Sequence, residues 1–361
     1  ADYSGCGHWR ILWPEQVINM TQRGLSQSIT AMIAEPRWYQ GVKAVKLQRQ
    51  ASKAQLEFVK HLKKIQQEHD FKIIYEVDDV VFREEIPDYN KFKFAFDTTE
   101  VRESVVSIMD MCDEITLTCD FMRKLFQSKL TNQKVTVIPN FVPYNWMGYL
   151  FNQSRVQTAF EKNKGKPRIL YTGSGAHYDV ANKTGGKDDM SAVNHIIRKT
   201  ADKYKWIFVG AYPPPLQDLV KSGKLEFYPW RSLLEYPQFI SNLDPQLMVA
   251  PLTPNNFNNS KSDIKFIEAC TLGIPCLCQD MHTYSNAPDD LKFNTPEEFE
   301  EKIEWILNWK NRKRYFQNIS RLREIGVKRF LENPENIGSH MEALTTPYGS
   351  PERKYLKQWN P

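Results

Sequence analysis

The chain has 361 residues, of which 41% are hydrophobic and 25% charged, a balance that favours a folded protein with a large core over extended disorder. At roughly 150 residues per domain, the length suggests two domains. The formal net charge of +5 permits an anionic partner, but the sequence lacks the dense basic stripe of a dedicated nucleic-acid binder.

Short β-rich runs alternate with longer helical patterns in the first part of the chain. Residues 52–69 place Phe58, Leu62 and Ile65 on one face of a helix. Such alternation predicts a parallel sheet with helices on both faces. The predicted strands are 29–34, 42–47, 72–77, 114–118 and 134–138, and the predicted helices are 52–69, 98–111 and 120–130.

Residues 143–166 interrupt the alternation with a polar stretch, and we place the domain linker there. The alternation then resumes, which predicts a second α/β unit of similar size. We expect an N-terminal domain over 1–145, a C-terminal domain over 146–332, and a tail over 333–361 that packs back toward the first domain. The second unit has predicted strands at 168–172, 206–210, 225–228, 246–250 and 274–278, and predicted helices at 188–204, 214–222, 232–243, 262–272, 296–309 and 311–331.

The opening segment Ser4-Gly5-Cys6-Gly7-His8-Trp9-Arg10 is the first candidate for chemistry. Gly5 and Gly7 would let the backbone approach a phosphate, and a following helix, with Pro14 in its first turn, would offer unpaired N–H groups. A plain tight turn explains the same pattern. A Rossmann unit needs a strand ahead of this loop, so either residues precede Ala1 or the interpretation fails.

Two further candidates follow predicted strands, at the edge of a parallel sheet where ligands bind. The pair Asp78-Asp79 could bind a metal, orient a hydroxyl or accept a proton, and a solvated turn or helix N-cap is the alternative. Gly173 and Ser174 suit a turn that carries backbone donors to a phosphate. His177 could touch a bound group, although a loop histidine is more often an ordinary surface residue. Residues 180–189 suggest a flexible insertion, a candidate lid.

The strongest candidate is Lys261-Ser262-Asp263-Ile264-Lys265-Phe266-Ile267-Glu268, on a predicted helix between two strands. Ser262 suits the N-cap of that helix. Lys265 and Glu268 lie one turn apart and share a face. A cation near the helix start and an acid one turn later suit a nucleoside diphosphate, with the Lys on phosphate and the Glu on ribose hydroxyls. The alternative is an ion pair on a solvent-exposed face, but the apolar neighbours favour a cleft.

The pattern Lys-Ser-Asp-x-x-Lys-x-x-Glu-Ala from Lys261, followed by Leu272-Gly273-Ile274-Pro275, resembles the donor-site helix of family-4 GT-B glycosyltransferases. Residues 75–79 and 137–140, the opening glycines, and Gly173-Ser174 with His177 and Asp179 look similar in the same order, so the resemblance covers nearly the whole chain. The opening looks like that of transferases carried by bacteriophages. The resemblance implies an α/β GT-B fold, with two Rossmann-like domains whose parallel sheets face a central cleft.

The resemblance also implies roles for individual residues. The donor would be a nucleotide-diphosphate sugar, with a UDP-sugar favoured, and its leaving group would be stabilised by cations and N–H groups without a metal or a further cofactor. Asp78 is the first catalytic candidate, with His8 and His177 behind it. The family often has a Glu-x7-Glu signature, and here Ser260 replaces its first acid. The residues expected to bind the donor are Gly5, Gly7, Arg10, Gly173, Ser174, Lys261, Ser262, Lys265 and Glu268.

The acceptor is open from sequence. The bacteriophage-like opening and mild basicity suggest a hydroxymethylated pyrimidine in double-stranded DNA, with backbone contacts from residues 37–39, 43–53 and 310–314. A cell-surface glycan is the alternative acceptor. A non-catalytic nucleotide-binding protein of the same fold is a further alternative, motivated by Ser260. A Rossmann dehydrogenase is disfavoured because no Gly-x-Gly-x-x-Gly with a following acid is present.

The cysteines and the hydropathy pattern bear on location. The six cysteines include no Cys-x-x-Cys pair, so neither a zinc ribbon nor a thioredoxin motif is present, and reduced buried thiols are expected. The sequence has no apolar run of about 18 residues and no signal peptide. We therefore expect a cytoplasmic protein without a membrane span.

Overall fold

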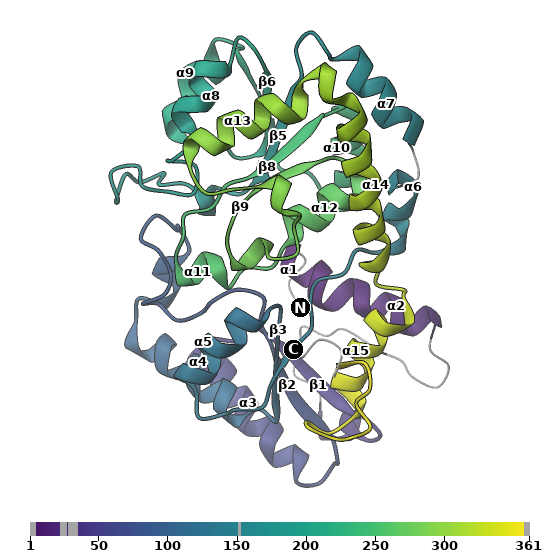
Figure 1. Cartoon of the computed structure of the whole chain (residues 1–361). Coiled ribbons are helices and arrows are strands. Elements are labelled where there is room, and N and C mark those ends of the chain that lie inside the picture. Colours follow the sequence, from purple (N-terminus) through teal and green to yellow (C-terminus); the bar gives the residue numbers. More distant parts are fainter. Residues whose placement is uncertain (1–4, 22–26, 28–34, 151–152, 357–361) are drawn as a thin grey trace.

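The structure is a computed structural model that describes residues 5–21, 27, 35–150 and 153–356. The chain forms two lobes, one above the other in Figure 1, each built on a parallel β-sheet with flanking helices. The predicted α/β architecture with two parallel sheets is confirmed. The strand predicted at 29–34 lies outside the described residues.

The lower lobe contains a four-stranded sheet in the order β1-β2-β3-β4. Its central strands are buried on both faces, with Ile73, Tyr75 and Ile115 fully enclosed, which explains why they read as apolar runs. Helix α3 begins with a capping box between Ser52 and Gln55. The elements are β1 (Ala44–Gln48), α3 (Lys53–Gln66), β2 (Lys72–Glu76), α4 (Thr99–Met111), β3 (Glu114–Leu117), α5 (Asp120–Lys129) and β4 (Val135–Val137).

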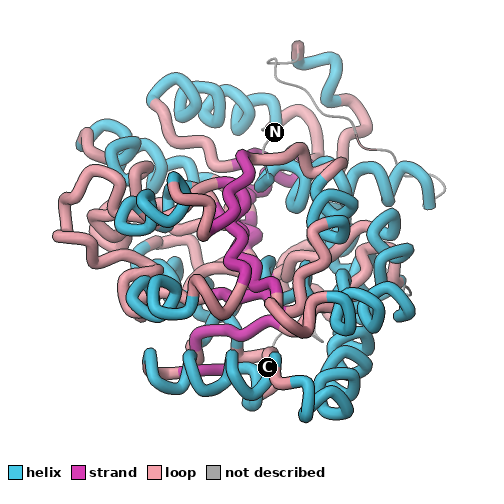
Figure 2. The backbone as a smooth tube through the Cα atoms, turned by 90° about the horizontal axis from the view of Figure 1, so that it is seen from above, coloured by secondary structure: helices cyan, strands magenta, loops and turns pink. Residues whose placement is uncertain are grey.

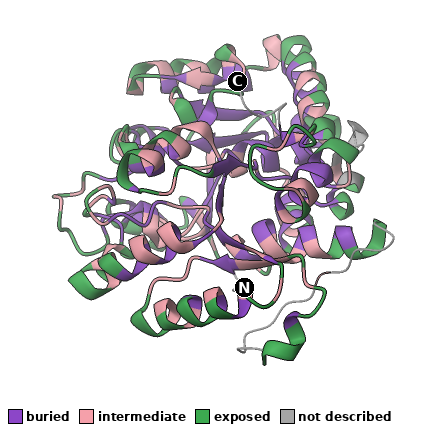
Figure 3. Cartoon of the chain, turned by 90° about the horizontal axis from the view of Figure 1, so that it is seen from below, coloured by how far each residue is buried: buried purple, intermediate pink, exposed green. Residues whose placement is uncertain are grey.

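The upper lobe contains a six-stranded parallel sheet in the order β10-β9-β8-β5-β6-β7. Seen along the length of the molecule, the strands run through the centre with helices on either side (Figure 2), and burial is concentrated on them (Figure 3). The strands are β5 (Arg168–Gly173), β6 (Lys205–Gly210), β7 (Leu225–Pro229), β8 (Leu247–Ala250), β9 (Cys276–Gln279) and β10 (Lys292–Phe293). The helices are α8 (Asn194–Thr200), α9 (Gln217–Lys221), α10 (Tyr236–Asn242), α11 (Asn256–Asn259), α12 (Ile264–Leu272), α13 (Pro296–Leu307) and α14 (Arg312–Lys328).

Three parts of the sequence prediction differ from the structure. The predicted linker 143–166 contains the helices α6 (Met147–Leu150) and α7 (Gln153–Lys162). The helix predicted at 188–204 begins only at Asn194, because the preceding residues are held in turns by Asp188. Strand β10 has two residues, too few to give a recognisable sequence pattern.

Residues 5–21 form one continuous helical segment made of α1 (Gly5–Gly7), the π-helical turn η1 (His8–Leu12) and α2 (Trp13–Thr21). The prediction of a glycine loop ahead of a helix is therefore wrong, and Gly7 itself has helical angles, φ −63° and ψ −40°. Pro14 lies inside the segment rather than in its first turn. Since Pro14 has no N–H, the ladder is interrupted there, and Trp13 N–H donates to the His8 carbonyl in the wider π pattern.

Two stretches that connect the lobes lie side by side. Val142 and Phe330 form a parallel β-bridge, and Val142 N–H donates to the Arg329 carbonyl at 2.8 Å while Leu331 N–H donates to the Val142 carbonyl at 2.8 Å. Helix α15 (Pro334–Thr345) then contacts α2. The domain boundaries at 145 and 332 stay predictions.

The chain after α15 returns to the lower sheet. Arg353 is 4% exposed and donates to both carboxylate oxygens of Glu114 on β3, at 2.7 and 2.6 Å. Lys72 reaches the same carboxylate at 2.9 Å and also donates to the carbonyls of Ala343 and Thr346. A buried acid in the lower sheet is thus neutralised by the end of the chain.

Candidate functional site

The start of α12 is fixed to the chain that connects the lobes. The prediction that Ser262 is the N-cap is wrong, because the N-cap is Asp263 and no side chain caps the helix. The Ser262 hydroxyl instead accepts a hydrogen bond from Asn140 Nδ2 at 2.9 Å. Arg329 holds the Asp263 carboxylate with two hydrogen bonds of 2.9 Å and also donates to the Asn140 carbonyl. These contacts set the direction in which the following turn of α12 points.

Lys265 and Glu268 lie on that helix and neither stands in open solvent. Glu268 is 6% exposed and accepts a hydrogen bond from the Tyr236 hydroxyl at 3.0 Å, while Lys265 is half-buried. Burial raises the pKa of Glu268 to about 7. Burial, and then the charge of Lys261, lowers the pKa of Lys265 to about 8. The alternative of an exposed ion pair between the two is wrong, since the acid binds Tyr236 instead.

His177 ends the 3-10 turn η5 (Gly175–His177) after β5, and its Nε2 lies 3.4 Å from Lys265 Nζ. Its Nδ1 lies 2.7 Å from Asp189 Oδ2. Burial and the charge of Lys265 lower the pKa of His177 to about 4, so the imidazole is neutral at pH 7. Because a carboxylate only accepts, Nδ1 carries the hydrogen and Nε2 presents its lone pair toward Lys265.

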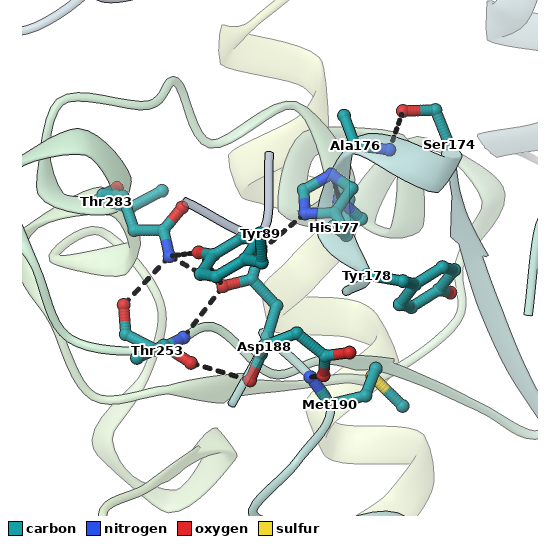
Figure 4. Close-up of polar contacts among 12 residues, drawn as sticks. Tyr89, Ser174, Ala176, His177, Tyr178, Asp188, Met190, Thr253 and Thr283 are labelled. Carbon is teal, nitrogen blue, oxygen red and sulfur yellow. Dashed lines mark hydrogen bonds and ion pairs between the residues drawn. The ribbon is translucent and has the colours of Figure 1, made fainter. Parts of the chain in front are cut away.

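Asp189 joins side chains of both lobes, and sequence reasoning missed it. Its Oδ1 accepts hydrogen bonds from the Tyr89 hydroxyl at 2.7 Å, Asn258 Nδ2 at 2.6 Å and the Thr253 N–H at 3.0 Å. Figure 4 draws Tyr89, His177 and Thr253 in this cluster of polar contacts. Hydrogen bonding to His177 and to the Thr253 N–H keeps the pKa of Asp189 below its usual value despite burial. The carboxylate is therefore ionised at neutral pH.

The segment 180–189 is tied down at both ends. The Asp179 carboxylate accepts hydrogen bonds from the N–H groups of Lys183 at 2.7 Å, Thr184 at 2.7 Å and Gly186 at 3.1 Å. Asp188 is 1% exposed and accepts from the Asp179 N–H. The two adjacent aspartates at 188–189 were the only hint in the sequence of this buried acid. In a polar stretch, such a pair is normally interpreted as solvent-exposed charge.

Gly173 and Gly210 lie opposite one another at the carboxyl ends of β5 and β6. A Cβ at Gly173 would stand 2.8 Å from the Tyr171 ring, and a Cβ at Gly210, where φ is +99°, would stand 2.5 Å from the Gly173 carbonyl oxygen. The missing Cβ at Gly173 thus leaves room for the Tyr171 ring beneath Lys265, whose Nζ lies 5.5 Å from the ring centre. Ser174 accepts from the Ala176 N–H, so that N–H is already used within the turn.

Asp78 follows β2 in the lower lobe, and its contacts are with residues of that lobe and of the N-terminal helix. Arg49 Nε lies 3.7 Å from Asp78 Oδ1, and the Cys6 thiol forms a side-chain hydrogen bond with the same carboxyl. Burial raises the pKa of Asp78. His8, two residues after Cys6, packs its ring edge-on against Trp13 at 5.7 Å. The structure therefore brings the opening segment and Asp78 together.

Arg10 is in the interior, which corrects its predicted contact with the donor phosphate. It is 0% exposed and donates to Glu76 Oε1 at 2.7 Å, to the Ile138 carbonyl at 2.6 Å and to Asn140 Oδ1 at 3.0 Å. Glu76 already neutralises its charge. Arg10 joins the N-terminal helix to β2 and to the connection between the lobes.

Lys261 lies at the boundary between the lobes, as does a hollow whose lining does not include it. Lys261 Nζ lies 4.5 Å from the centre of the Phe257 ring, and Phe257, on α11, packs in the core of the lower lobe.

A hollow of about 340 Å³ is lined by both lobes. Its lining residues are Asp88, Tyr89, Lys91, Gly175, Asp179, Val180, Ala181 and Lys183. Lys265 and Glu268 do not line this hollow.

Comparison with known proteins identifies the fold. No protein-family model and no curated protein matches the sequence. Among solved structures, Anabaena HepE in complex with UDP is 14% identical with a TM-score of 0.55, over 86% of this chain and 81% of that chain. A glycosyltransferase from Rickettsia africae is 13% identical with a TM-score of 0.53, over 88% and 84% of the two chains. OtsA is 12% identical with a TM-score of 0.52, over 93% and 82%.

The chain has the GT-B fold. In this GT-B chain the candidate residues follow the carboxyl ends of strands, where open α/β sheets bind ligands. Gly173 ends β5, Thr253 follows β8, and Asp78 follows β2 of the other sheet. Among the helices of the described residues, none is both long and apolar enough to span a membrane.

Proposed function

We propose that this GT-B protein transfers a sugar from a nucleotide-diphosphate sugar to an acceptor hydroxyl. One observation carries the proposal. Lys265 stands beside a neutral imidazole and Lys261 lies over the Phe257 ring at the lobe boundary, and in the part of the chain that the structure describes neither ammonium forms an ion pair. Half-buried cations without a carboxylate partner favour binding of an anion, and a diphosphate supplies two adjacent charges.

In the proposed complex, Lys261 and Lys265 contact the diphosphate and Glu268 accepts hydrogen bonds from the ribose. The raised pKa of Glu268 fits this role, because ribose hydroxyl donors would favour the ionised form on binding. We also propose that backbone and hydroxyl groups surround the donor, contributed by Gly5, Gly7, Gly173, Ser174 and Ser262. A UDP-sugar is favoured since HepE, which shares the fold, is described with UDP and with UDP-glucose.

Asp78 is the proposed group for orienting or deprotonating the acceptor. Burial raises its pKa, which strengthens it as a proton acceptor once it is ionised. The other two candidates for this role are His8, at the start of the π-helical turn that follows Cys6, and His177, beside Lys265. The charge that develops on the leaving diphosphate is proposed to be stabilised by the two lysines, without a metal ion.

For the acceptor we propose a hydroxymethylated pyrimidine in double-stranded DNA. Trp38 is 68% exposed beside the exposed Arg37, and residues 310–314 add a basic run at the start of α14. Aromatic and basic side chains at a surface can contact bases and phosphates. We also propose a cytoplasmic location, in keeping with six free cysteines.

The test mixes the protein with a panel of nucleotide-sugars and with duplex DNA that contains or lacks hydroxymethylcytosine, and follows UDP release and DNA mass. We expect a mass gain of one sugar only on the hydroxymethylated duplex. Sugar transfer to a glycan panel but not to DNA would keep the enzyme class and replace the acceptor. UDP binding without release or transfer from any donor would support the alternative of a non-catalytic nucleotide-binding protein.

A further inference from the structure

A buried hydrogen-bond network ties the lower lobe to His177 of the upper lobe. Tyr89 lies between β2 and α4 of the lower lobe and is 6% exposed, and its hydroxyl donates to Asp189 Oδ1 at 2.7 Å. Asn258 Nδ2 donates to both the Tyr89 oxygen at 3.0 Å and Asp189 Oδ1 at 2.6 Å. The Tyr89 hydroxyl is thus the lower-lobe member of a network whose other members belong to the upper lobe.

The other oxygen of Asp189 determines the state of the imidazole. Oδ2 takes the Nδ1 hydrogen of His177, so the lone pair of Nε2 is directed to the side where Lys265 Nζ lies 3.4 Å away. An imidazole held this way can accept a hydrogen bond from a hydroxyl beside the lysines. If the Asp189 carboxylate turned, the ring would lose both its fixed tautomer and its orientation.

We propose that Tyr89 is a positioning residue that makes the orientation of His177 depend on lobe closure. The proposal rests on the proposed transferase function for its kinetic consequence. In the closed arrangement the Tyr89 hydroxyl completes the set of donors around Asp189, and the ordered carboxylate orients His177 toward the donor sugar. When the lobes separate, the hydroxyl leaves and the carboxylate loses a partner. Closure and the arrangement of the catalytic groups are thereby coupled.

Tyr89→Phe removes only the hydroxyl and tests the proposal. We expect kcat to fall about tenfold to a hundredfold, as for loss of a hydrogen bond to a charged group, with the affinity for UDP unchanged within about twofold because Tyr89 lies outside the lysine pair. The matched control is Tyr315→Phe, which loses a buried hydroxyl bound to the Gln246 carbonyl at 2.8 Å. Equal kcat in Tyr89→Phe and Tyr315→Phe would overturn the proposal.

Imidazole nitrogen NMR gives a readout that a general loss of stability does not move. In the wild type we expect His177 to show one neutral tautomer with the hydrogen on Nδ1, and in Tyr89→Phe a mixture. A single unchanged tautomer in the variant would refute the coupling even if no sugar donor is ever found, which separates this test from that of the transferase function.

A second variant covers the case in which Tyr89→Phe folds poorly. In Asp189→Asn the amide cannot hold the His177 hydrogen as the carboxylate does, so kcat should fall at least as far as in Tyr89→Phe. Adding Tyr89→Phe to Asp189→Asn should then lower kcat by less than about twofold, since Tyr89 acts through Asp189. Full additivity of the two losses would contradict the proposed route.

Discussion

The ammonium of Lys265 lies 3.4 Å from the Nε2 of a neutral His177, where most buried ammoniums would have a carboxylate. Burial, and then the charge of Lys265, lowers the pKa of His177 to about 4, while burial, and then the charge of Lys261, lowers the pKa of Lys265 to about 8. An anionic ligand beside both would raise both pKa values. The pair is therefore arranged to gain favourable charge interactions on binding.

The first prediction concerns Lys265. Replacing it by Met keeps the aliphatic stem over Tyr171 and removes the charge, so we expect the Kd for UDP to rise about tenfold to a hundredfold, as for a lost hydrogen bond to a charged group. Isothermal titration calorimetry measures this directly. Lys224→Met, which removes an exposed ammonium paired with Asp202, is the control and should bind UDP like the wild type. Wild-type affinity in Lys265→Met would refute the donor-site assignment.

The second prediction concerns pH and Glu268. Its pKa is about 7 in the folded protein against an ordinary value of 4.5, so the folded state binds the proton more tightly. The tighter proton binding of Glu268 therefore stabilises the folded state fully below about pH 4.5, and this contribution to the unfolding free energy is lost as the pH rises from 4.5 through 7. Glu268→Gln avoids the loss, so its unfolding free energy relative to wild type should rise from pH 5 to pH 8, with an upper bound of ~3 kcal/mol. Urea unfolding at both pH values measures it.

The exposed Glu301→Gln serves as the background variant for that series. Its stability relative to wild type should change little between the two pH values. If Glu268→Gln behaves the same way, the folded-state carboxyl titrates like a solvated one and the buried placement of Glu268 is wrong.

The third prediction separates structure from donor binding at Arg10. Arg10→Met leaves the Glu76 carboxylate buried without its nearest partner, so we expect a loss of about 3–5 kcal/mol in unfolding free energy. The affinity for UDP of the folded fraction should not change. Arg37→Met, which removes an exposed pair with Glu35, should cost less than about 1 kcal/mol. A large loss of UDP affinity at unchanged stability would restore Arg10 to the donor site.

The fourth prediction concerns the close packing at the end of β5. Gly173→Ala places a methyl group 2.8 Å from the Tyr171 ring, so we expect destabilisation of about 1–3 kcal/mol and displacement of the ring under Lys265. The urea midpoint gives the first effect and weaker UDP binding the second. Gly165→Ala is the control, since nothing lies within 4 Å of the added Cβ there. Equal midpoints for the two variants would show that the turn relaxes freely.

Much of the fold was predictable because it depends on local periodicity. Nine of the predicted strands overlap β1 to β9, since parallel strands buried on both faces read as short apolar runs between turns. The two-residue β10 and the short helix α11 have no period to detect. The opening glycines were misread because glycine marks a loop by default, and the missing N–H of Pro14 reveals a π turn only in three dimensions.

The site was predictable where its residues are close in sequence. Lys265 and Glu268 share one helix and could be inferred from spacing. The network of Tyr89, Asp189 and Asn258 joins positions separated by up to 169 residues, and only the fold brings them together. Arg10 shows the reverse error, because its partner Glu76 lies 66 residues away and a lone arginine near glycines reads as a phosphate ligand.

The paired backbone at Val142 and Phe330 restricts how the two halves of the molecule can move. Because the two connecting segments are hydrogen-bonded to each other, they act as a single hinge. The lobes can rotate about this hinge, but the paired backbone resists twisting and sliding of one lobe relative to the other. We expect a hinge motion about the paired backbone, in which the lobes separate most at the edge farthest from the hinge. Two spin labels, one on each lobe at the edge farthest from the hinge, should change their separation when UDP is added. Labels placed beside the paired backbone at Val142 and Phe330 should show almost no change.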